Sequence, residues 1–321
     1  MYMAQAAGTP TASPNAPPPD APTAPSATHR YLVSSRLRAE LESRRYTGKW
    51  GAGADLKHLP DANDRIIRDG GFSLDRTQVA VPKPPPAERV AYPPDISPPP
   101  LPPRFSLTEL CCANIDTLTA ALALGDACAL SFANPVEHGG RYRHGARAQE
   151  EDLCRLLPQL YASLAAAAAD GEYPIRPDGV LVSRGLLAVR RPGSYELCEP
   201  PAQGVTILTA AMPCGAADHG RPKGGWAGSA WAVDVAGRVR TVLHAARATG
   251  HANLVLGAWG CGAFGNPTGA VAAVFRVQLE LAEFRGAFAH VVFAVLDPLG
   301  TGNLKPFQKE LHAPWVEYVV S

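Results

Sequence analysis

Apolar runs alternate with segments of helical periodicity from residue 104 onward. Short runs of valine, leucine and isoleucine are typical of buried strands, and longer segments with apolar residues three or four positions apart are typical of helices. Strands that alternate with helices predict an α/β sheet covered by helices on both faces. We expect strands at 127–132, 180–182, 186–189, 205–209, 254–256 and 290–296, and helices at 150–167, 231–248 and 271–284.

The first hundred residues differ, because 19 of the 32 prolines lie within 1–103. Residues 1–28 carry too little apolar surface to offset the entropy lost on ordering, so we expect a disordered proline-rich leader. Residues 34–46 predict a serine-capped helix, and 47–81 give no clear period. The run 82–103 is typical of a polyproline II connector or surface strap, or of a ligand for a proline-reading module. We divide the chain into the leader (1–28), an N-terminal helix with an extended segment (29–104), and an α/β domain (105–321).

Composition narrows the function classes only slightly. The formal net charge is +1, with 30 basic and 29 acidic residues, which does not call for sequence-specific nucleic-acid binding or a membrane. We see neither an apolar secretion signal nor a span of about 18 apolar residues. Seven cysteines without a CxxC pair favour reduced thiols, so we expect a cytoplasmic protein, although a different kind of secretion signal stays open. We expect no metal and no cofactor, since the sequence holds no ligand cluster.

The first candidate site is the segment 134–151, NPVEHGGRYRHGARAQEE, which follows a buried strand and opens a helix. Glycines let backbone N–H groups approach an anion closely, and a helix N-terminus adds favourable partial charge. Glu150 and Glu151 point about 100° apart on a helix, so one could hold ribose hydroxyls while the other acts as acid and base. A helix N-terminus lowers a carboxyl pKa, whereas a general acid needs a raised one. Ordinary helix capping is the alternative explanation of these acids.

The second candidate site is the segment 257–266, GAWGCGAFGN, which lies between a predicted strand and a predicted helix. Its GxGxxG pattern invites a dinucleotide-binding interpretation. We disfavour that interpretation, because the acid that ends the next strand, Asp297, is too distant and the motif lies late in the chain. Cys261 has no histidine placed to activate it, so we expect a small packing residue there.

The string NPxxxGGxxxxGAxAQEEDLCR resembles the microbial-type poly(ADP-ribose) glycohydrolases, a branch of the macrodomain superfamily. The resemblance implies a macrodomain-like three-layer α/β/α fold with a central mixed sheet. It also implies that Glu151 is the catalytic acid and base, that Glu150 and Asn134 hold the distal ribose, and that Gln149, Gly139 and Gly140 complete the motif. It covers roughly residues 30–50 and 105–312.

The segment 257–266 is similar to the phosphate loop of the same family. The resemblance implies that backbone amides cradle a diphosphate and that Phe264 packs over the ligand, whereas we expect Trp259 in the core. The implied ligand-binding residues are Gly260, Cys261, Gly262, Ala263, Phe264, Gly265 and Asn266. Asp116 resembles the family aspartate that meets the adenine amino group, with an N-cap of a helix at 117–124 as the alternative.

One departure from the family pattern concerns Arg141, which stands where the family has a third glycine. Arg141 either points outward, or pairs with phosphate and reshapes the site for another ADP-ribosyl substrate. His138 replaces a family proline, and we assign it no role.

The resemblance implies an ADP-ribosyl glycohydrolase that cleaves O-glycosidic bonds of ADP-ribose. Its partner would be ADP-ribose on a polymer or on a protein, and we expect a monomer. Two rivals stay open, namely a hydrolase of single ADP-ribose units on protein and a non-catalytic ADP-ribose reader.

Overall fold

The computed structural model describes residues 29–51, 54–92, 102–200, 204–215, 225–298 and 302–312. The predicted leader 1–28 and residues 93–101 of the proline run lie outside the described residues. The strands are β1 Arg30–Val33, β2 Gly71–Leu74, β3 Thr77–Ala80, β4 Glu88–Ala91, β5 Leu107–Ala113, β6 Ala127–Phe132, β7 Gly179–Leu186, β8 Val205–Ala210, β9 Asn253–Leu256 and β10 His290–Ala294. The helices are α1 Ser35–Ser43, α2 Leu59–Asp69, α3 Thr117–Leu124, α4 Gln149–Leu156, α5 Pro158–Ala169, α7 Ala230–Thr249, α8 Thr268–Leu279 and α9 Leu304–Leu311, with a 3-10 turn η1 at Tyr142–His144.

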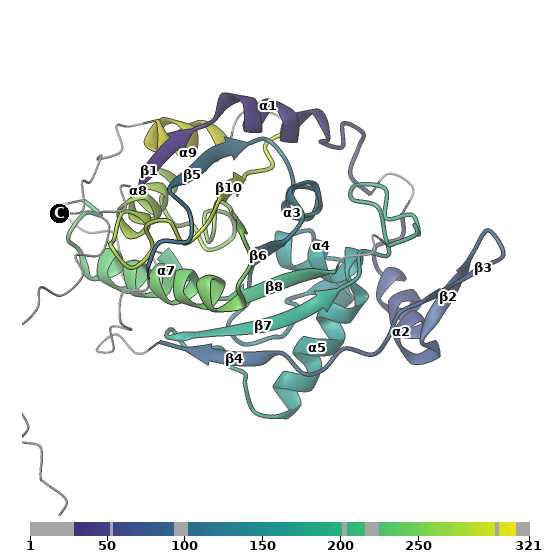
Figure 1. The fold of residues 1–321 in the computed structure, drawn as a ribbon. Helices are drawn as coiled ribbons and strands as arrows, with labels where there is room; N and C mark the ends of the chain where they lie inside the picture. The colour runs from purple at the N-terminus through teal and green to yellow at the C-terminus, as the bar shows by residue number, and fades with distance from the viewer. Residues whose placement is uncertain are drawn as a thin grey trace, which may run out of the picture.

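The centre of the fold is an eight-stranded sheet in the order β1-β5-β10-β9-β6-β8-β7-β4 (Figure 1). Neighbouring strands run parallel from β1 to β8. The strand β7 is antiparallel to β8, and β4 is antiparallel to β7. The predicted α/β fold with a central mixed sheet is therefore confirmed.

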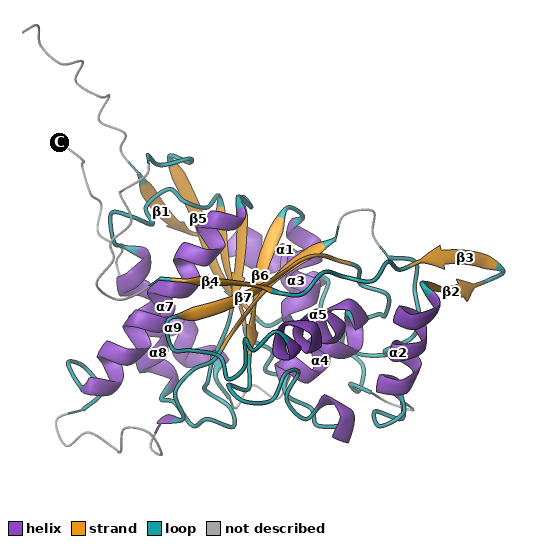
Figure 2. Ribbon diagram, turned by 90° about the horizontal axis from the view of Figure 1, so that it is seen from below, coloured by secondary structure: helices purple, strands orange, loops and turns teal. Residues whose placement is uncertain are grey.

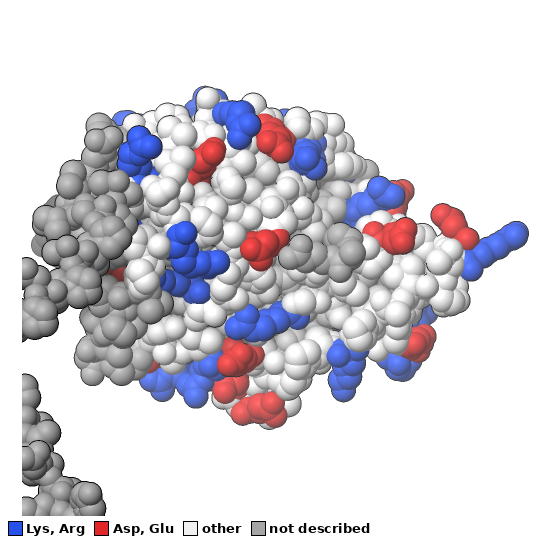
Figure 3. Space-filling model, viewed as in Figure 1, with Lys and Arg blue, Asp and Glu red and all other residues white. Residues whose placement is uncertain are grey.

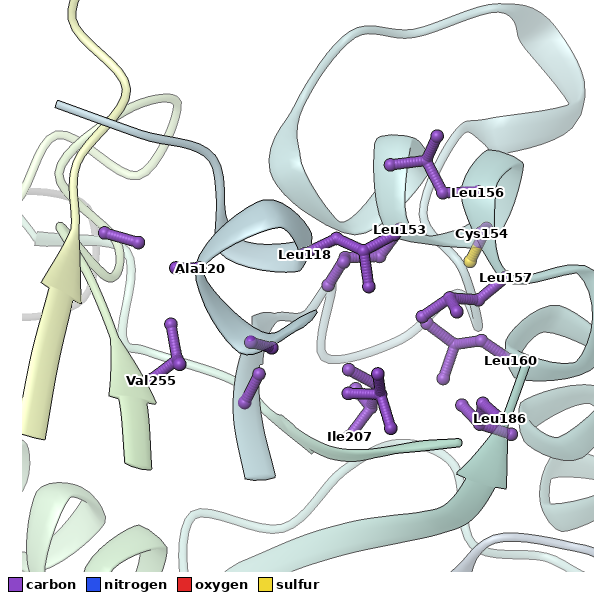
Figure 4. Close-up of a cluster of buried hydrophobic side chains, with 14 of the residues drawn as sticks. Leu118, Ala120, Leu153, Cys154, Leu156, Leu157, Leu160, Leu186, Ile207 and Val255 are labelled. Carbon is purple, nitrogen blue, oxygen red and sulfur yellow. The ribbon is translucent and has the colours of Figure 1, made fainter. Parts of the chain in front are cut away.

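Helices cover both faces of the sheet. Helices α1, α3, α4 and α5 bury one apolar cluster against it, and α7, α8 and α9 bury the other. Figure 4 shows part of the first cluster, in which Leu118 of α3, Leu153 of α4 and Leu160 of α5 lie above Ile207 of β8. Burying such a side chain contributes about 1.5–3 kcal/mol. The helices that carry the candidate site are thus fixed by packing.

Several predicted boundaries were wrong. The helix expected at 150–167 is two helices, because the chain breaks at Leu157 (ψ 79°) and Pro158 starts a new helix. The strand expected at 180–182 extends over Gly179–Leu186 as β7, whereas residues 187–189 of the strand expected at 186–189 lie beyond its end. The helix expected to reach residue 284 ends at Leu279. Part of the proline run is the edge strand β4, which pairs with β7 instead of forming only a connector.

Residues 47–81, which gave no clear period, contain α2 and the hairpin β2–β3. Asp75 and Arg76 form its turn with positive φ angles of 46° and 69°. Figures 1 and 2 both show this hairpin projecting from the body beside α2. Within the described ranges, no helix is long and apolar enough to cross a membrane.

Candidate active site

Gln149 fixes the start of α4 to the carboxyl end of β6. Its side-chain oxygen accepts a hydrogen bond from Phe132 N (2.8 Å), and its amide donates to Leu130 O (2.8 Å) and to Thr117 Oγ1 on α3 (3.0 Å). These bonds occupy the side chain, so Gln149 positions the two glutamates that follow it, and the structure does not support direct ligand contact by this side chain.

Glu150 and Glu151 are each held by one backbone N–H of the loop before α4. Asn134 N donates to Glu150 Oε2 (2.8 Å), and Arg141 N donates to Glu151 Oε1 (3.0 Å). The two residues are 2% and 6% exposed. Their other oxygens, Glu150 Oε1 and Glu151 Oε2, are buried without a partner among the described residues. A buried polar atom without a partner costs free energy, so each carboxylate retains an oxygen suited to bind a substrate group.

The close approach of the loop backbone to the two glutamates requires glycine at two positions of the loop before α4. Gly139 (φ 68°) and Gly140 (φ 55°) have left-handed backbone angles. A Cβ on Gly140 would lie 2.6 Å from Glu151 Oε1 and 3.1 Å from Glu150 Oε2. Arg141 has a φ of −93°, which any residue adopts, and its side chain is exposed. The backbone N–H at this position holds Glu151 whatever the side chain, which explains why the third family glycine can be an arginine.

Electrostatics favour a proton on Glu150. The pKa of Glu150 is raised to about 8, mainly by burial; the bond from Asn134 N opposes the rise, and the nearby charge of Glu151 adds to it. Burial thus outweighs the helix N-terminus that the sequence suggested would lower such a pKa.

A buried network of polar side chains holds the loop before α4 in place. Asn63 of α2 donates to Tyr142 Oη and Arg155 O (both 3.0 Å), and it accepts from Arg190 Nε (2.8 Å). Arg155 is 0% exposed, and it donates to Asp152 (2.6 Å) and to the carbonyl of Ala146. This network was not predicted from the sequence, and no motif could have revealed the role of Asn63. For Arg155, the sequence did hold a signal, because a charged residue among the leucines of a predicted buried helix face indicates a buried polar interaction.

The second candidate loop lies beside the first, because β9 and β6 are adjacent parallel strands. A Cβ on Gly257 would lie 2.8 Å from the Phe132 ring. Asn266 is 3% exposed and fixes the loop: it accepts from Trp231 Nε1 (2.7 Å) and donates to Pro213 O (2.9 Å) and Gly260 O (3.1 Å). These three bonds assign the Asn266 side chain a role in fixing the loop, and ligand binding by Asn266 stays a prediction.

Three consecutive backbone N–H groups, those of Gly262, Ala263 and Phe264, have no acceptor among the residues that the structure describes. Gly260 (φ 72°) must be glycine, because its Cβ would lie 2.5 Å from Asn266 Nδ2. Gly265 also has a positive φ, of 64°. The loop therefore presents amides in a turn conformation that suits an anion.

The remaining predicted residues fall into packing and capping positions. Trp259 is buried, and burial raises the pKa of the Cys261 thiol to about 12, which agrees with a packing residue. Phe264 is half-buried against the same core cluster. Asp116 caps α3 by accepting from Thr119 N (2.9 Å), yet its Oδ2 is buried without a partner among the described residues. The Asn134 amide oxygen accepts from Val136 N and Glu137 N.

Two buried carboxylates are suited to the hydrolysis of a glycosidic bond. A neighbouring loop whose backbone N–H groups have no described acceptor is suited to bind a phosphate of the same substrate. No group of three or more metal-ligating side chains occurs in the described ranges.

Residues 72–178 match the family model "Microbial-type PARG, catalytic domain". The chain is similar to a solved poly(ADP-ribose) glycohydrolase (PARG) from Thermomonospora curvata, with 29% identity, a TM-score of 0.64, and coverage of 80% of this chain and 99% of that chain. It is also similar to the PARG from Deinococcus radiodurans in complex with ADP-ribose, with 28% identity, a TM-score of 0.56, and coverage of 88% and 99%. No curated protein sequence matches. The resemblance to the microbial-type PARG family is therefore confirmed.

Proposed function

We propose that the protein is an ADP-ribosyl glycohydrolase with Glu151 as its general acid and base. One observation carries the proposal: Glu150 and Glu151 are buried side by side, each fixed by a backbone N–H, and each has an oxygen without a described partner. The PARG family model and the PARG structures support the same class of enzyme.

In the proposed reaction, Glu151 protonates the leaving oxygen as the bond from ribose C1″ to that oxygen breaks. The sugar passes through an oxocarbenium-like state. The Glu151 carboxylate then takes a proton from a water molecule, whose hydroxyl oxygen bonds to C1″. One water is consumed, and Glu151 regains its proton. Glu150 and Asn134 would hold the distal ribose, and Glu150, whose pKa is raised to about 8, would keep its proton at neutral pH.

The second loop would bind the diphosphate. The N–H groups of Gly262, Ala263 and Phe264 offer donors to it, and anions stabilise such an array. The Phe264 ring would cover the ligand. The unpartnered Oδ2 of Asp116 would accept from the adenine amino group while its Oδ1 caps α3.

The test is ADP-ribose release by the wild type and by Glu151→Ala, from ADP-ribose polymer and from mono-ADP-ribosylated protein. We expect release by the wild type and a loss of at least about a thousandfold in the variant, because the acid and base are both removed. ADP-ribose affinity, measured by calorimetry, should change little. If both proteins bind ADP-ribose equally and neither releases it from any substrate, the reader hypothesis replaces this proposal.

We further propose that the domain is macrodomain-like, and that the protein acts as a monomer in the cytoplasm without sequence-specific nucleic-acid binding. Cys111, Cys112, Cys128, Cys154, Cys198 and Cys261 form no disulfide in the described ranges, which supports a reducing compartment. Sedimentation and cell fractionation test the two proposals.

A further inference from the structure

An open groove of about 520 Å³ lies between the end of α1, one face of α3 and the loop after β7. We call it the arginine groove, and it is lined by Arg44, Arg45, Tyr46, Thr119, Arg191 and Pro192. Its volume is in the range of ligand sites. Three arginines from two segments that are far apart in the sequence thus line one depression.

The positive charge of the groove is poorly balanced. Arg44 lies 3.9 Å from Glu40, a long contact between two exposed side chains. No described residue forms an ion pair with Arg45 or Arg191. Figure 3 shows charges of both signs interspersed over the face that it displays. Like charges held together repel, and an anion in the groove would relieve that repulsion.

The groove adjoins the candidate active site through α3. Thr119 lines the groove, and its N–H donates to Asp116. Thr117, two residues earlier in α3, accepts from Gln149, which precedes the two glutamates. The backbone of Arg191 is fixed by bonds to Glu196 and Tyr195, so its position beside the groove is set by the fold.

We propose that the arginine groove binds a diphosphate of a second ADP-ribose unit, next to the unit in the active site. This rests on the proposed function, in which the amides of the second loop already take the diphosphate of the first unit. The groove cations are then left for another anion on the same substrate. An ADP-ribose polymer carries a diphosphate in every unit, whereas a single ADP-ribose on a protein offers none beyond the first. The groove therefore selects polymer over mono-modified protein.

The experiment compares Arg45→Gln/Arg191→Gln with the matched double variant Arg65→Gln/Arg76→Gln. The control arginines are exposed on α2 and the β2–β3 turn, and no described residue forms an ion pair with them. Each double variant is combined with Glu151→Gln, so that binding can be titrated without cleavage. The probes are monomeric ADP-ribose, ADP-ribose oligomers of several units, and single-stranded DNA of equal charge, with fluorescence anisotropy or calorimetry as the readout.

We expect the groove variant to weaken oligomer binding roughly tenfold, through loss of two charge-assisted contacts. The salt dependence of oligomer binding should fall by about 1.4 in the slope of log K against log salt. Monomer binding, and the control variant with every probe, should match the parent. With Glu151 intact, the groove variant should raise KM for polymer at unchanged kcat.

Three results would overturn the inference. Unchanged oligomer affinity in the groove variant means that the groove is not used. An equal loss for monomer and oligomer places Arg45 and Arg191 in the first subsite or in folding. Equal groove-dependent binding of single-stranded DNA indicates a general polyanion surface. Absence of hydrolysis by the wild type would instead contradict the proposed function, and the binding titrations would still decide the groove.

Discussion

The two glycine loops lie at the carboxyl ends of neighbouring strands, β6 and β9, yet they use their backbone amides in opposite ways. The loop before α4 donates two N–H groups to the protein's own carboxylates. The loop after β9 is fixed by the side-chain amide of Asn266, which donates to Pro213 O and Gly260 O. The backbone N–H groups of Gly262, Ala263 and Phe264 in this loop have no described acceptor. One loop therefore positions acids, and the other is suited to receive an anion.

The sharpest way to break the first loop is Gly140→Ala. The new methyl group would lie 2.6 Å from Glu151 Oε1, and φ is 55°, so the carboxylate must move. We expect kcat to fall about a hundredfold, because a displaced acid loses most of its effect. The control is Gly171→Ala, where φ is 85° but nothing lies within 4 Å. Similar losses in both variants would mean that backbone strain, and not the carboxylate, explains the effect.

Breaking the second loop should affect binding more than chemistry. Asn266→Ala removes three hydrogen bonds that fix the loop, at a cost of about 1–3 kcal/mol. We expect the Kd for ADP-ribose to rise about thirtyfold, measured by calorimetry. Asn253→Ala is the matched control, because this buried amide bonds Gly125 O at the other end of β9. If Asn253→Ala weakens binding equally, the loop is not the cause.

The pH dependence separates the two loops further, since only the first contains an acid pair. The pKa of Glu150 is raised to about 8, so the carboxyl is protonated below that pH and loses the proton above it. We expect hydrolysis to fall about tenfold per unit above roughly pH 8. ADP-ribose binding by the second loop should stay level. Glu150→Gln cannot ionise, so its lower activity should lack this slope, and an identical slope would assign the titration to another group.

The smallest effect should follow Arg141→Gly. The N–H that holds Glu151 is kept, and the arginine has an ordinary φ of −93° with an exposed side chain. We expect kcat to change by less than about threefold, because no contact to the acids is lost. Steady-state assays on polymer measure this. A tenfold change in either direction would show that the arginine side chain takes part in the site.

Local signals in the sequence were sufficient to predict much of the fold and the positions of both candidate loops along the chain. Alternating apolar runs located β6, β8, β9 and β10, and Ser34 marked the start of α1. The break at Pro158 was also visible in the sequence but was missed. The support network was not predictable in this way, because Asn63, Tyr142 and Arg190 are distant along the chain. The role of Asn266 in fixing the second loop was not predictable either, because its partners Trp231 and Pro213 are distant along the chain.

Both outer strands of the sheet, β1 and β4, precede residue 105, and each pairs with a strand that follows it. During synthesis these strands emerge before β5 and β7, so neither has its partner when it leaves the ribosome. Pairing between distant segments is slow, and unpaired edges are prone to aggregation. The edge strands should therefore join last, over a core of later strands. The charged and proline-rich sequence around β4 would then keep β4 from associating with other chains until β7 has been synthesised.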